Sequence, residues 1–390
     1  MQPPSAVVLA AGEGSRLRPL TEHRPKPMLP AATKPILEHV LDELCAAGVP
    51  EFTLVVGHGR RRVQSHFGPS YRDRPIEYVH QEKQLGSGHA LLAAEDAVDA
   101  PCLVVNGDQI VDRQILGDVL DGHDGAAATL GVVGHADPSE YGGASIEDGL
   151  VTGLVERPRE DGEYLLNAGV YVLEDAAFGA IRRAEPRAGE HTLTDGLAEL
   201  IDAGERVDGV VSEGLWVDAT YPWDLLHVAD DVLADGRNVE SGVDPDAWVH
   251  ESATVRDPAV ISADCVVGPG AVVGPGSCLG ENVTVGANAV VEGSVVDADT
   301  RVGANATLVD CVTGRGVRVG NGSTVVGGPG DVRIGDRVHS GERLGALLAD
   351  RARDGGGVTY APGTVVGSSA VVHAGSTVRG TIPDGAEVRG

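Results

Sequence analysis

A glycine-rich loop with fixed positive charges follows a short apolar run near the start of the chain. The residues able to contact phosphate are small or cationic: Gly12, Gly14, Ser15, Arg16 and Lys26. Small residues let backbone N–H groups approach a polyphosphate closely, and the cations supply charge that those dipoles cannot. An apolar strand that leads into such a loop is the geometry of nucleotide sites in open α/β sheets. This stretch therefore predicts a site for a polyphosphate.

The same stretch resembles the signature of the sugar-1-phosphate nucleotidylyltransferases, L-A-A-G-x-G-(S/T)-R-L-x-P followed by K-P. The matching positions are Leu9, Ala10, Ala11, Gly12, Gly14, Ser15, Arg16, Leu17, Pro19, Lys26 and Pro27. Neither the dinucleotide pattern G-x-G-x-x-G nor the P-loop pattern is completed. The resemblance implies that Leu9, Ala11, Gly12, Gly14 and Ser15 line the nucleotide, and that Arg16 and Lys26 are catalytic. The alternative is a tight turn whose Arg and Lys are only solvated.

A second segment, Q-E-K-Q-L-G-S-G-H-A at residues 81–90, resembles the base-reading segment of the N-acetylglucosamine-1-phosphate uridylyltransferases. The resemblance implies that Gln81 bonds to the pyrimidine edge and that Gly86 and Ser87 line the base and ribose. An amide side chain offers both a donor and an acceptor, and a glycine permits close backbone contact. The alternatives are a surface glutamine at position 81 and a helix N-terminal residue at His89.

Two aspartates follow apolar strand-like runs, where sheet-borne ligands are expected. Asp108 ends V-V-N-G-D, and Asp218 lies in a stretch that resembles the W-x-D-x-(G/T)-x-P-x-x-L-L segment of the same family. The resemblance implies that both hold Mg²⁺ against the nucleotide phosphates, since magnesium takes one or two carboxylates plus phosphate and water. An aspartate without such a motif is more often a solvated surface charge. Asp112 and Asp224 occupy no position to which a motif assigns a ligand role.

Three further elements, Y-G-G at 141–143, E-R-P at 156–158 and N-A-G at 167–169, resemble the family's sugar-reading elements in order. The resemblance implies that Gly142, Glu156 and Asn167 contact the hydroxyl and N-acetyl groups of a hexose. Arg157 stands where many relatives have lysine. Its planar fork would still clamp a sugar phosphate, and a salt-bridged surface arginine is the alternative.

The resemblance implies one main reaction and two alternatives. A sugar-1-phosphate (N-acetylglucosamine-1-phosphate or glucose-1-phosphate) would attack the α-phosphorus of UTP or dTTP, releasing pyrophosphate with Mg²⁺ as cofactor. Positioning and charge neutralisation would carry this step, and we expect deletion of Arg16, Lys26 or Asp108 to have little effect on folding. The resemblance is closest to the archaeal bifunctional type, whose second domain also acetylates glucosamine-1-phosphate from acetyl-CoA. A regulatory or scaffold subunit without activity is less compatible with the intact motifs.

The elements that must position these residues change in character along the chain. Short apolar runs alternate with helical patterns in the first half: Val7–Ala10, Thr53–Val56, Cys102–Val105, Thr129–Val133 and Gly169–Leu173. Between the first two, residues 36–47 have helical spacing, and Gly48 is placed to end that helix. The pattern predicts an α/β fold with a mostly parallel sheet covered on both faces. With the resemblance, it predicts a Rossmann-like mixed-sheet nucleotidyltransferase domain over 1–235.

From residue 249 to 390 the chain has a period of six. Aliphatic residues recur at Val255, Ile261, Val267, Val273, Leu279, Val285 and Val291, and the frame resumes after a one-residue slip. This period predicts a left-handed parallel β-helix, interrupted near residues 327–359 and preceded by a linker over 236–248. A disordered glycine-rich tail is the alternative. Such prisms commonly pack into trimers, so we expect a homo-oligomer.

The β-helix has an eroded acetyl-transfer pattern. Residues 325–331 read V-V-G-G-P-G-D where the acetyltransferase-bearing relatives are expected to have an Asn-Leu-Arg-type loop, and no lysine follows Lys83. His339 and His373 belong to no pattern that we can assign. Acetyl-CoA is therefore an expected substrate only in the alternative interpretation.

Composition sets the class of partners. The net charge of −28 argues against nucleic acid and anionic membranes. Arginine supplies 27 of the 30 basic residues, as in proteins of halophiles, which makes the lysine at position 26 informative. The five cysteines have no metal or C-x-x-C spacing, and no stretch has the length and apolarity of a signal peptide or membrane span. We therefore expect a soluble cytoplasmic protein.

Overall fold

Strand β1 (Ala6–Ala10) is the apolar run that leads into the glycine-rich loop, and all five of its residues are buried. It pairs in parallel with β4 (Phe52–Val56) on one side and with β7 (Cys102–Asn106) on the other. Leu9 lies opposite Asn106 in this register. Because parallel strands end at the same edge of a sheet, the residues that follow β1 and β7 emerge together there.

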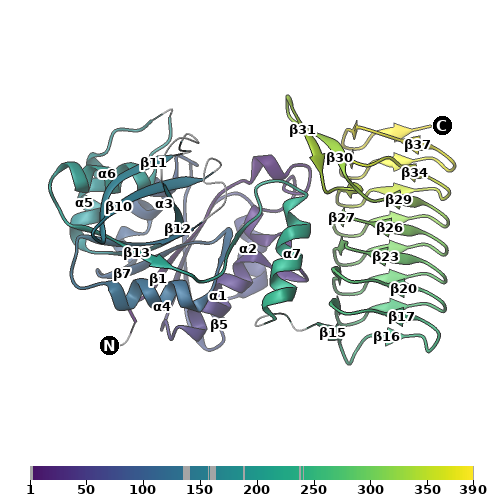
Figure 1. The fold of residues 1–390 in the computed structure, drawn as a ribbon, viewed down its shortest axis with the longest axis horizontal. Helices are drawn as coiled ribbons and strands as arrows, with labels where there is room; N and C mark the ends of the chain where they lie inside the picture. The colour runs from purple at the N-terminus through teal and green to yellow at the C-terminus, as the bar shows by residue number, and fades with distance from the viewer. Residues whose placement is uncertain are drawn as a thin grey trace. The chain divides into compact units, whose positions relative to one another are not determined.

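The sheet around β1 has ten strands in the order β10-β11-β13-β9-β12-β7-β1-β4-β6-β5 (Figure 1). Its other members are β5 (Ser70–Tyr71), β6 (Arg74–His80), β9 (Ala128–Val133), β10 (Gly142–Glu147), β11 (Leu150–Glu156), β12 (Leu165–Leu173) and β13 (Val207–Ser212). β12 runs antiparallel to both β7 and β9. The sheet is therefore mixed, as the family resemblance implied and contrary to the mostly parallel sheet that the strand–helix alternation alone indicated.

Helices cover both faces of this sheet. The face that receives Val8 is packed by α1 (Ile36–Ala46), α2 (Arg60–Phe67) and α4 (Arg113–Gly122). The face that receives Val7 is packed by α3 (Ser87–Ala93), α5 (Asp175–Arg183) and α6 (Leu193–Asp202). Helix α1 spans the predicted segment, and Gly48 has a φ of 84° two residues after its end, which is the left-handed conformation of a helix-terminating glycine.

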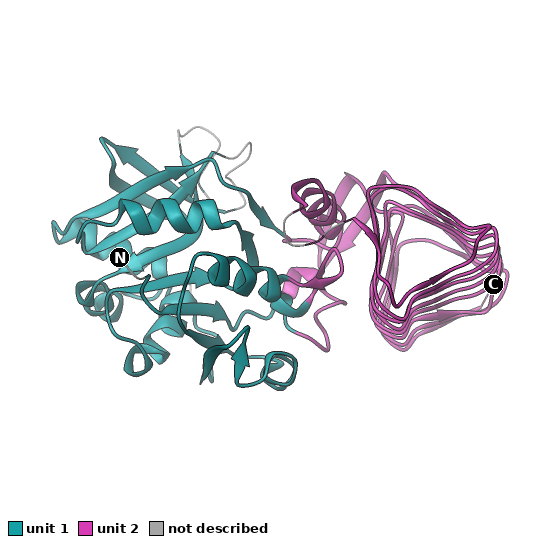
Figure 2. Ribbon diagram, turned by 90° about the horizontal axis from the view of Figure 1, so that it is seen from below, with its two compact units in different colours: residues 1–13, 25–28, 36–218 teal, residues 14–24, 29–35, 219–390 magenta. Residues whose placement is uncertain are grey.

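The computed structural model describes residues 3–134, 141–156, 158, 164–187, 189–236, 239 and 241–389. The chain divides into two units (Figure 2). The first consists of residues 1–13, 25–28 and 36–218, and the second of residues 14–24, 29–35 and 219–390. Two short N-terminal segments therefore belong to the same unit as the C-terminal half of the chain.

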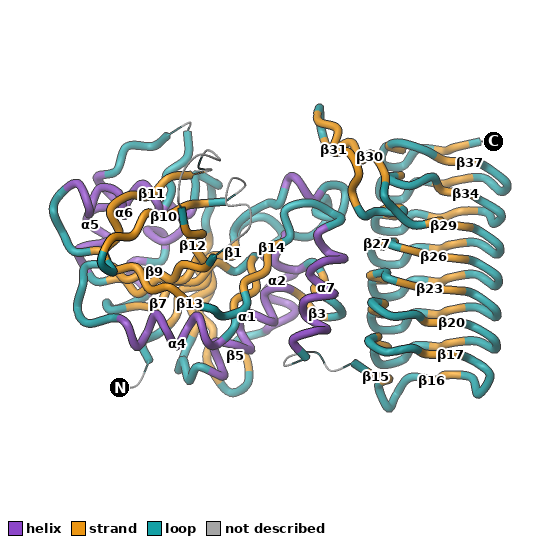
Figure 3. Tube along the Cα trace, viewed as in Figure 1, coloured by secondary structure: helices purple, strands orange, loops and turns teal. Residues whose placement is uncertain are grey.

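The second unit contains three parallel sheets that form the faces of a prism (Figure 3). The first has β15 (Gly242–Val243), β18 (Ala259–Ile261), β21 (Ser277–Leu279), β24 (Val295–Val296), β27 (Cys311–Thr313), β32 (Ala346–Leu348), β35 (Thr364–Val366) and β38 (Thr381–Ile382). The second has β16 (Trp248–Val249), β19 (Val266–Val267), β22 (Thr284–Val285), β25 (Arg301–Val302), β28 (Arg318–Val319), β33 (Arg353–Asp354), β36 (Val371–Val372) and β39 (Glu387–Val388). The third has β17 (Thr254–Val255), β20 (Val272–Val273), β23 (Val290–Glu292), β26 (Thr307–Val309), β29 (Thr324–Val326), β34 (Thr359–Tyr360) and β37 (Thr377–Val378).

These sheets are those of a left-handed parallel β-helix, and the predicted period is confirmed in its core. Ile261, Val267 and Val273 are buried on successive faces, each at most 1% exposed. Each pairs with the residue one rung further along, as Val267 does with Val285. All five cysteines of the chain are buried and free.

A hairpin interrupts the β-helix between β29 and β32. It consists of β30 (Gly330–Ile334) and β31 (Arg337–Glu342). The interruption is shorter than predicted, because β32 pairs with β27 and Tyr360 pairs with Val325 in the regular register. Tyr360 is 2% exposed in the prism interior and donates a hydrogen bond to Asp354 at 3.0 Å. An aromatic residue therefore takes a position that the period predicts to be aliphatic.

The rest of the second unit includes a helix, a short pair of strands and a 3₁₀ turn. Helix α7 (Asp224–Asp235) ends at Gly236 with a φ of 66°. Strands β2 (Pro30–Ala31) and β3 (Lys34–Pro35) pair with one another, and a short 3₁₀ helix spans Ser15–Leu17. The first β-helix strand, β15, begins at Gly242.

Candidate functional site

A buried lysine lies between two carboxylates in the first unit. Lys26 is 8% exposed, and its Nζ lies 2.6 Å from Asp218 Oδ1 and 3.2 Å from Asp108 Oδ2. The Asp218 side chain is 3% exposed, whereas that of Asp108 is 33% exposed. The structure thus brings together three residues that the sequence placed in one site. The burial of Lys26 argues against the expectation that its deletion has little effect on folding.

The two aspartates meet because of a small antiparallel ribbon. β8 (Gln109–Val111) pairs with β14 (Trp216–Asp218), and Asp218 lies opposite Gln109. Asp108 immediately precedes β8, so the pairing sets the two carboxylates side by side. Gly107 makes the approach to β1 possible, because a Cβ there would lie 2.9 Å from a Val8 methyl group.

The charges of this cluster determine the protonation of Lys26. Burial acts to lower the pKa of the ammonium group, but Asp108 and Asp218 outweigh it and raise the pKa above its ordinary value. The lysine is therefore held as a cation in a place where an isolated charge would be costly.

The donor set fits a divalent cation. Two carboxylates already converge on a single positive charge, and the more exposed of them, Asp108, is open to solvent and ligands. Magnesium commonly takes one or two carboxylates and completes its shell with phosphate and water. Among the described residues, no group of three or more His, Cys, Asp or Glu side chains is placed to hold a metal.

The glycine-rich loop starts directly after β1. A Cβ at Gly12 would meet no atom within 4 Å, so internal packing does not require a glycine at that position. Gly14 has a φ of 67° and a ψ of 45°, a conformation that favours glycine. Gln84 of the second motif donates a hydrogen bond to the Ala11 carbonyl at 2.7 Å, which ties residues 81–90 to the start of the loop.

The chain matches the protein-family model described as "Nucleotidyl transferase" over residues 5–235. This chain belongs to the nucleotidyl transferase family. A second model, described as "GMPPB C-terminal domain", matches residues 255–383 of this nucleotidyl transferase.

Curated relatives support this membership. The bifunctional protein GlmU of Methanococcus maripaludis is 38% identical over 226 residues, which cover 57% of this chain and 52% of that protein. The UTP–glucose-1-phosphate uridylyltransferase AglF of Haloferax volcanii is 37% identical over 225 residues, which cover 56% of this chain and 92% of that protein. The chain thus spans about half the length of the GlmU relatives that it matches. A crystal structure of UDP-glucose pyrophosphorylase complexed with UDP-glucose shares the fold, with a TM-score of 0.54 over 60% of this chain and 99% of that chain, at 23% identity.

The segment over residues 81–90, which the sequence predicts to read the base, is internally hydrogen-bonded in this nucleotidyl transferase. Gln81 is 4% exposed, and its Nε2 lies 3.1 Å from the Gly86 carbonyl and 2.9 Å from His89 Nδ1. Ser87 Oγ accepts from the Leu193 N–H at 2.9 Å. Gly86 has a φ of 103°, and a Cβ there would lie 2.5 Å from the His191 carbonyl oxygen. Gln81, Gly86 and Ser87 are therefore brought together, and each also has a role in local packing.

The predicted sugar-reading residues gather in the same unit. Gly142 lies near Asn167, since a Cβ at Gly142 would be 3.7 Å from the Asn167 Cβ. Asn167 donates to the Tyr171 hydroxyl at 2.8 Å and accepts from the Gly169 N–H. Glu156 accepts from Thr194 Oγ1 at 2.8 Å, a partner that sequence reasoning missed. Arg157 lies outside the described residues.

Arg16 belongs to the second unit, and Asp112 and Asp224 form local hydrogen bonds to backbone N–H groups. Arg16 lies over the ring of Tyr221, with Cζ 5.8 Å from the ring centroid. Tyr221 is a residue that sequence reasoning missed, although it stands in the same motif as Asp218. Asp112 caps α4 by accepting from Gln114 and Ile115 N–H groups. Asp224 accepts from the N–H groups of Thr220 and Tyr221.

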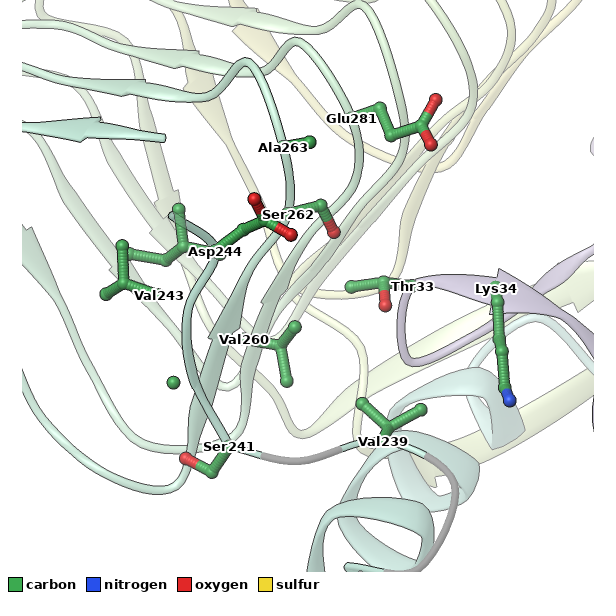
Figure 4. Close-up of a pocket in the computed structure, with 12 residues that line it drawn as sticks. Thr33, Lys34, Val239, Ser241, Val243, Asp244, Val260, Ser262, Ala263 and Glu281 are labelled. Atoms are coloured by element: carbon green, nitrogen blue, oxygen red, sulfur yellow. The ribbon is translucent and has the colours of Figure 1, made fainter. Parts of the chain in front are cut away.

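A separate hollow of about 480 Å³ lies beside the first rungs of the β-helix (Figure 4). Its polar lining residues include Lys34, Asp244, Ser262 and Glu281. None of the residues predicted to bind substrate lines it, and we assign it no chemistry. In the described part of the chain, no helix has both the length and the apolarity to cross a membrane.

Proposed function

We propose that this nucleotidyl transferase transfers the uridylyl group of UTP to a hexose-1-phosphate, with dTTP as the competing nucleotide. The observation that carries the proposal is the cluster of Lys26, Asp108 and Asp218, which combines an enclosed cation with a carboxylate open to solvent. The sugar phosphate oxygen forms the new bond to the α-phosphorus, and the bond to the β-phosphate oxygen breaks. The products are a nucleotide sugar and pyrophosphate.

In this mechanism the chain's residues position charge rather than form a covalent intermediate. Backbone N–H groups of Gly12, Gly14 and Ser15, with the apolar lining of Leu9 and Ala11, bind the triphosphate together with the guanidinium of Arg16. The open space at Gly12 supports this role, because it leaves room for a ligand to approach the backbone. The Lys26 ammonium turns partly from the two carboxylates toward the reacting phosphates and neutralises charge on them.

We further propose that Asp108 and Asp218 hold Mg²⁺ when substrate is bound. The ion would supply charge neutralisation and orientation of the phosphate oxygens. Before substrate arrives, the Lys26 ammonium contacts the same two carboxylates. One ammonium offsets only one of the two carboxylates, so the free cluster keeps a net negative charge that a bound cation would offset.

The nucleotide base and the sugar are assigned to separate segments. Gln81, Gly86 and Ser87 contact the pyrimidine and ribose, while Gly142, Glu156, Arg157 and Asn167 contact the hexose phosphate. Uracil and thymine differ by one methyl group, which hydrophobic pockets discriminate weakly. The name of the AglF relative favours glucose-1-phosphate, whereas the GlmU relatives are named only as bifunctional proteins and their name states no sugar.

A second candidate is acetyl transfer from acetyl-CoA to glucosamine-1-phosphate by the β-helix. The GlmU relatives are named as bifunctional proteins, and this is the observation that favours a second activity. The two β-helix histidines that sequence analysis left unassigned have other partners: His339 lies against two aromatic rings, and His373 lies 3.6 Å from Glu387. We therefore rank this activity second.

For the domains, we propose that residues 1–235 form the nucleotidyltransferase domain, 236–248 a linker and 249–390 the β-helix domain. We propose a trimer formed through the β-helix and a cytoplasmic location. Trp248 and Val266, which pair on neighbouring rungs, are 53% and 38% exposed and would lie in such an interface. Light scattering of the purified chain should then give three times the mass of one chain, and the mass of a single chain would overturn the trimer.

The test of function is a panel of four nucleoside triphosphates against several sugar-1-phosphates, with pyrophosphate release as the signal. We expect signal with UTP, and absence of pyrophosphate with every pair would overturn the proposal. A parallel reaction with acetyl-CoA and glucosamine-1-phosphate, read by free thiol, tests the second candidate. Arg16→Ala and Asp108→Ala should each lose most of the pyrophosphate signal.

A further inference from the structure

The segment that carries Arg16 is held by the unit that contains the β-helix. Residues 14–24 belong to the second unit, although the residues on either side of them in the chain belong to the first. Within the segment, Thr21 Oγ1 donates to the Gly14 carbonyl at 2.8 Å, and the Leu20 N–H donates to the Leu17 carbonyl. The segment is thus a folded turn with its own hydrogen bonds.

A buried ion cluster anchors the end of this turn. Arg24 is 4% exposed, and its guanidinium lies 2.5 Å from Asp297 and 3.4 Å from Asp350. Both carboxylates follow strands of the first β-helix sheet, Asp297 after β24 and Asp350 after β32. The β-helix therefore supplies the compensating charge for an arginine that stands two residues before Lys26 in the chain.

An aromatic pair supports the other end of the turn. Tyr221 and Trp223 are stacked, with ring centroids 4.7 Å apart and planes within 7°. Arg16 lies over the Tyr221 ring, and Trp223, the other ring of the stack, is 4% exposed. Asp224 fixes the Tyr221 backbone by accepting its N–H at 2.7 Å. Tyr221 is thus a fixed surface for the Arg16 guanidinium.

The β30–β31 hairpin closes on the same aromatic pair. The His339 ring lies 4.5 Å from the Tyr221 ring and 5.1 Å from the Trp223 ring, centroid to centroid. The hairpin also faces the turn directly, because Arg18 and Glu22 line the same hollow as Arg333 of the hairpin. The insertion that interrupts the β-helix therefore lies beside the residues that carry Arg16.

The base of the hairpin is set by tight backbone packing. A Cβ at Gly330 would lie 2.4 Å from the carbonyl carbon of Pro362, and one at Gly363 would lie 2.4 Å from the Asp331 carbonyl oxygen. At the neighbouring corner, Arg343 binds Asp230 of α7 at 2.5 Å and Asp310 at 2.8 Å. Both the hairpin and the helix that follows the aromatic pair are therefore attached to the prism.

We propose that the β-helix and its hairpin position Arg16 for nucleotide binding, with Tyr221 and His339 as positioning residues and Arg24 as the anchor of the turn. The inference rests on the proposed function, since it takes Arg16 as the triphosphate ligand. It gives the hairpin a role in the N-terminal reaction rather than in a reaction of its own. A cation over an aromatic ring is favoured by the ring's quadrupole, so loss of the ring frees the guanidinium to sample other orientations.

The first test measures UTP binding by calorimetry in the full-length chain. Tyr221→Leu removes the ring, and we expect the Kd for UTP to rise about fivefold, since this interaction is modest at exposed sites. Tyr221→Phe keeps the ring and should bind UTP like the parent chain. His339→Ala should raise the Kd about threefold by the same reasoning. His373→Ala, an exposed histidine of the β-helix away from the hairpin, is the matched control and should leave the Kd unchanged.

The outcomes separate this inference from the proposed function. A parent chain that binds UTP and shows no change on Tyr221→Leu or His339→Ala overturns the inference alone. A Tyr221→Phe variant as weak as Tyr221→Leu also overturns it, because the ring would then not be the source. A parent chain that binds none of the four nucleoside triphosphates overturns the proposed function and this inference with it. In turnover assays, the effect should fall on the KM for nucleotide and spare that for the sugar phosphate.

Hydrogen exchange tests the anchor without any substrate. In Asp350→Asn, we expect the amides of Leu17 and Leu20 to exchange faster than in the parent chain, because the turn loses charge compensation at Arg24. The amides of α4 in the first unit serve as the internal reference and should be unchanged. Equal exchange of the turn in both proteins would overturn the role of Arg24 as an anchor.

Discussion

Among the residues that the structure describes, two buried cations each face two carboxylates, and each unit contains one of them. In the first unit Lys26 faces Asp108 and Asp218, and in the second Arg24 faces Asp297 and Asp350. For both cations, burial acts to lower the pKa and the carboxylates raise it above the ordinary value. The same arrangement of charge thus occurs twice, only two residues apart in the chain.

The two clusters differ in how exposed their carboxylates are to solvent. Asp108 is 33% exposed beside Lys26, whereas the Asp297 and Asp350 side chains are 10% and 9% exposed. A lysine ammonium is a compact charge on a flexible stem, and an arginine guanidinium is a planar fork suited to fixed pairs. The comparison indicates that the lysine cluster is built to exchange partners and the arginine cluster to hold a segment in place.

Removal of Lys26 should give the largest effect. We expect Lys26→Met to lower kcat about 10³-fold, because one preorganised charge at the reacting phosphates is lost. Pyrophosphate release under saturating substrates measures this. Lys83→Met, which changes an exposed lysine that is not among the residues proposed to contact substrate, is the control and should retain activity. If Lys26→Met retained most of its turnover, the Lys26 cluster would have a structural role like that of the Arg24 cluster, and the contrast between them would be wrong.

The same variant tests the metal site without activity. Without the ammonium, the enclosed Asp218 and its neighbour Asp108 lack compensation, so the thermal midpoint should fall. Magnesium should raise that midpoint again in Lys26→Met, and less so when Asp108→Asn is added. If magnesium left the thermal midpoint unchanged, this would argue against Asp108 and Asp218 as magnesium ligands.

Removal of Arg24 should act on stability rather than on the chemical step. We expect Arg24→Met to lower the free energy of unfolding by about 3–5 kcal/mol, because it leaves two buried carboxylates without a partner. Arg24→Lys keeps the charge and should lose less. Chemical denaturation measures both.

An exposed pair of the β-helix provides the control for Arg24. Arg315 lies 3.4 Å from Asp299, and both side chains are about half exposed. Arg315→Met should cost at most about 1 kcal/mol, since exposed ion pairs contribute little. Equal losses for Arg24→Met and Arg315→Met would mean that burial does not distinguish the anchor.

The β-helix could be predicted from the sequence almost residue by residue. A fixed period of six determines which side chains enter the prism, and Ile261, Val267 and Val273 are buried as that period requires. The inserted hairpin could not be placed, because residues 330–342 leave the period and their position depends on tertiary packing. The interior position of Tyr360 could not be predicted either, because an aromatic residue does not match the aliphatic repeat.

The candidate site was predictable as a set of residues but not as an arrangement. The motifs supplied Lys26, Asp108 and Asp218, yet the contact among them depends on the pairing of β8 with β14, which joins distant parts of the chain. The membership of residues 14–24 in the second unit was likewise invisible. Arg24 finds Asp350 326 residues further along the chain, and no local pattern predicts such a partner.

A smaller effect should distinguish Gly86, which is tightly packed, from Gly125, which is not. The quantity compared is the loss of stability when each is changed to alanine. Gly86 and Gly125 both have positive φ, but a Cβ meets the His191 backbone at 2.5 Å at Gly86 and nothing within 4 Å at Gly125. Gly125→Ala should cost about 1 kcal/mol from backbone strain alone, and Gly86→Ala about 1–3 kcal/mol more. Denaturation midpoints measure the difference, and equal costs would mean that the contact with residue 191 yields without penalty.

The smallest effect concerns pH. The pKa of Lys26 is raised above its ordinary value of 10.5, so the folded chain binds this proton more tightly than the unfolded chain does. The resulting stabilisation is fully present below pH 10.5 and is lost only as pH rises through the folded value. The difference in unfolding free energy between the parent chain and Lys26→Met should therefore stay constant to within about 0.5 kcal/mol from pH 7 to pH 9.5. A difference that shrinks in this range would mean that Asp108 and Asp218 do not hold the ammonium in its charged form.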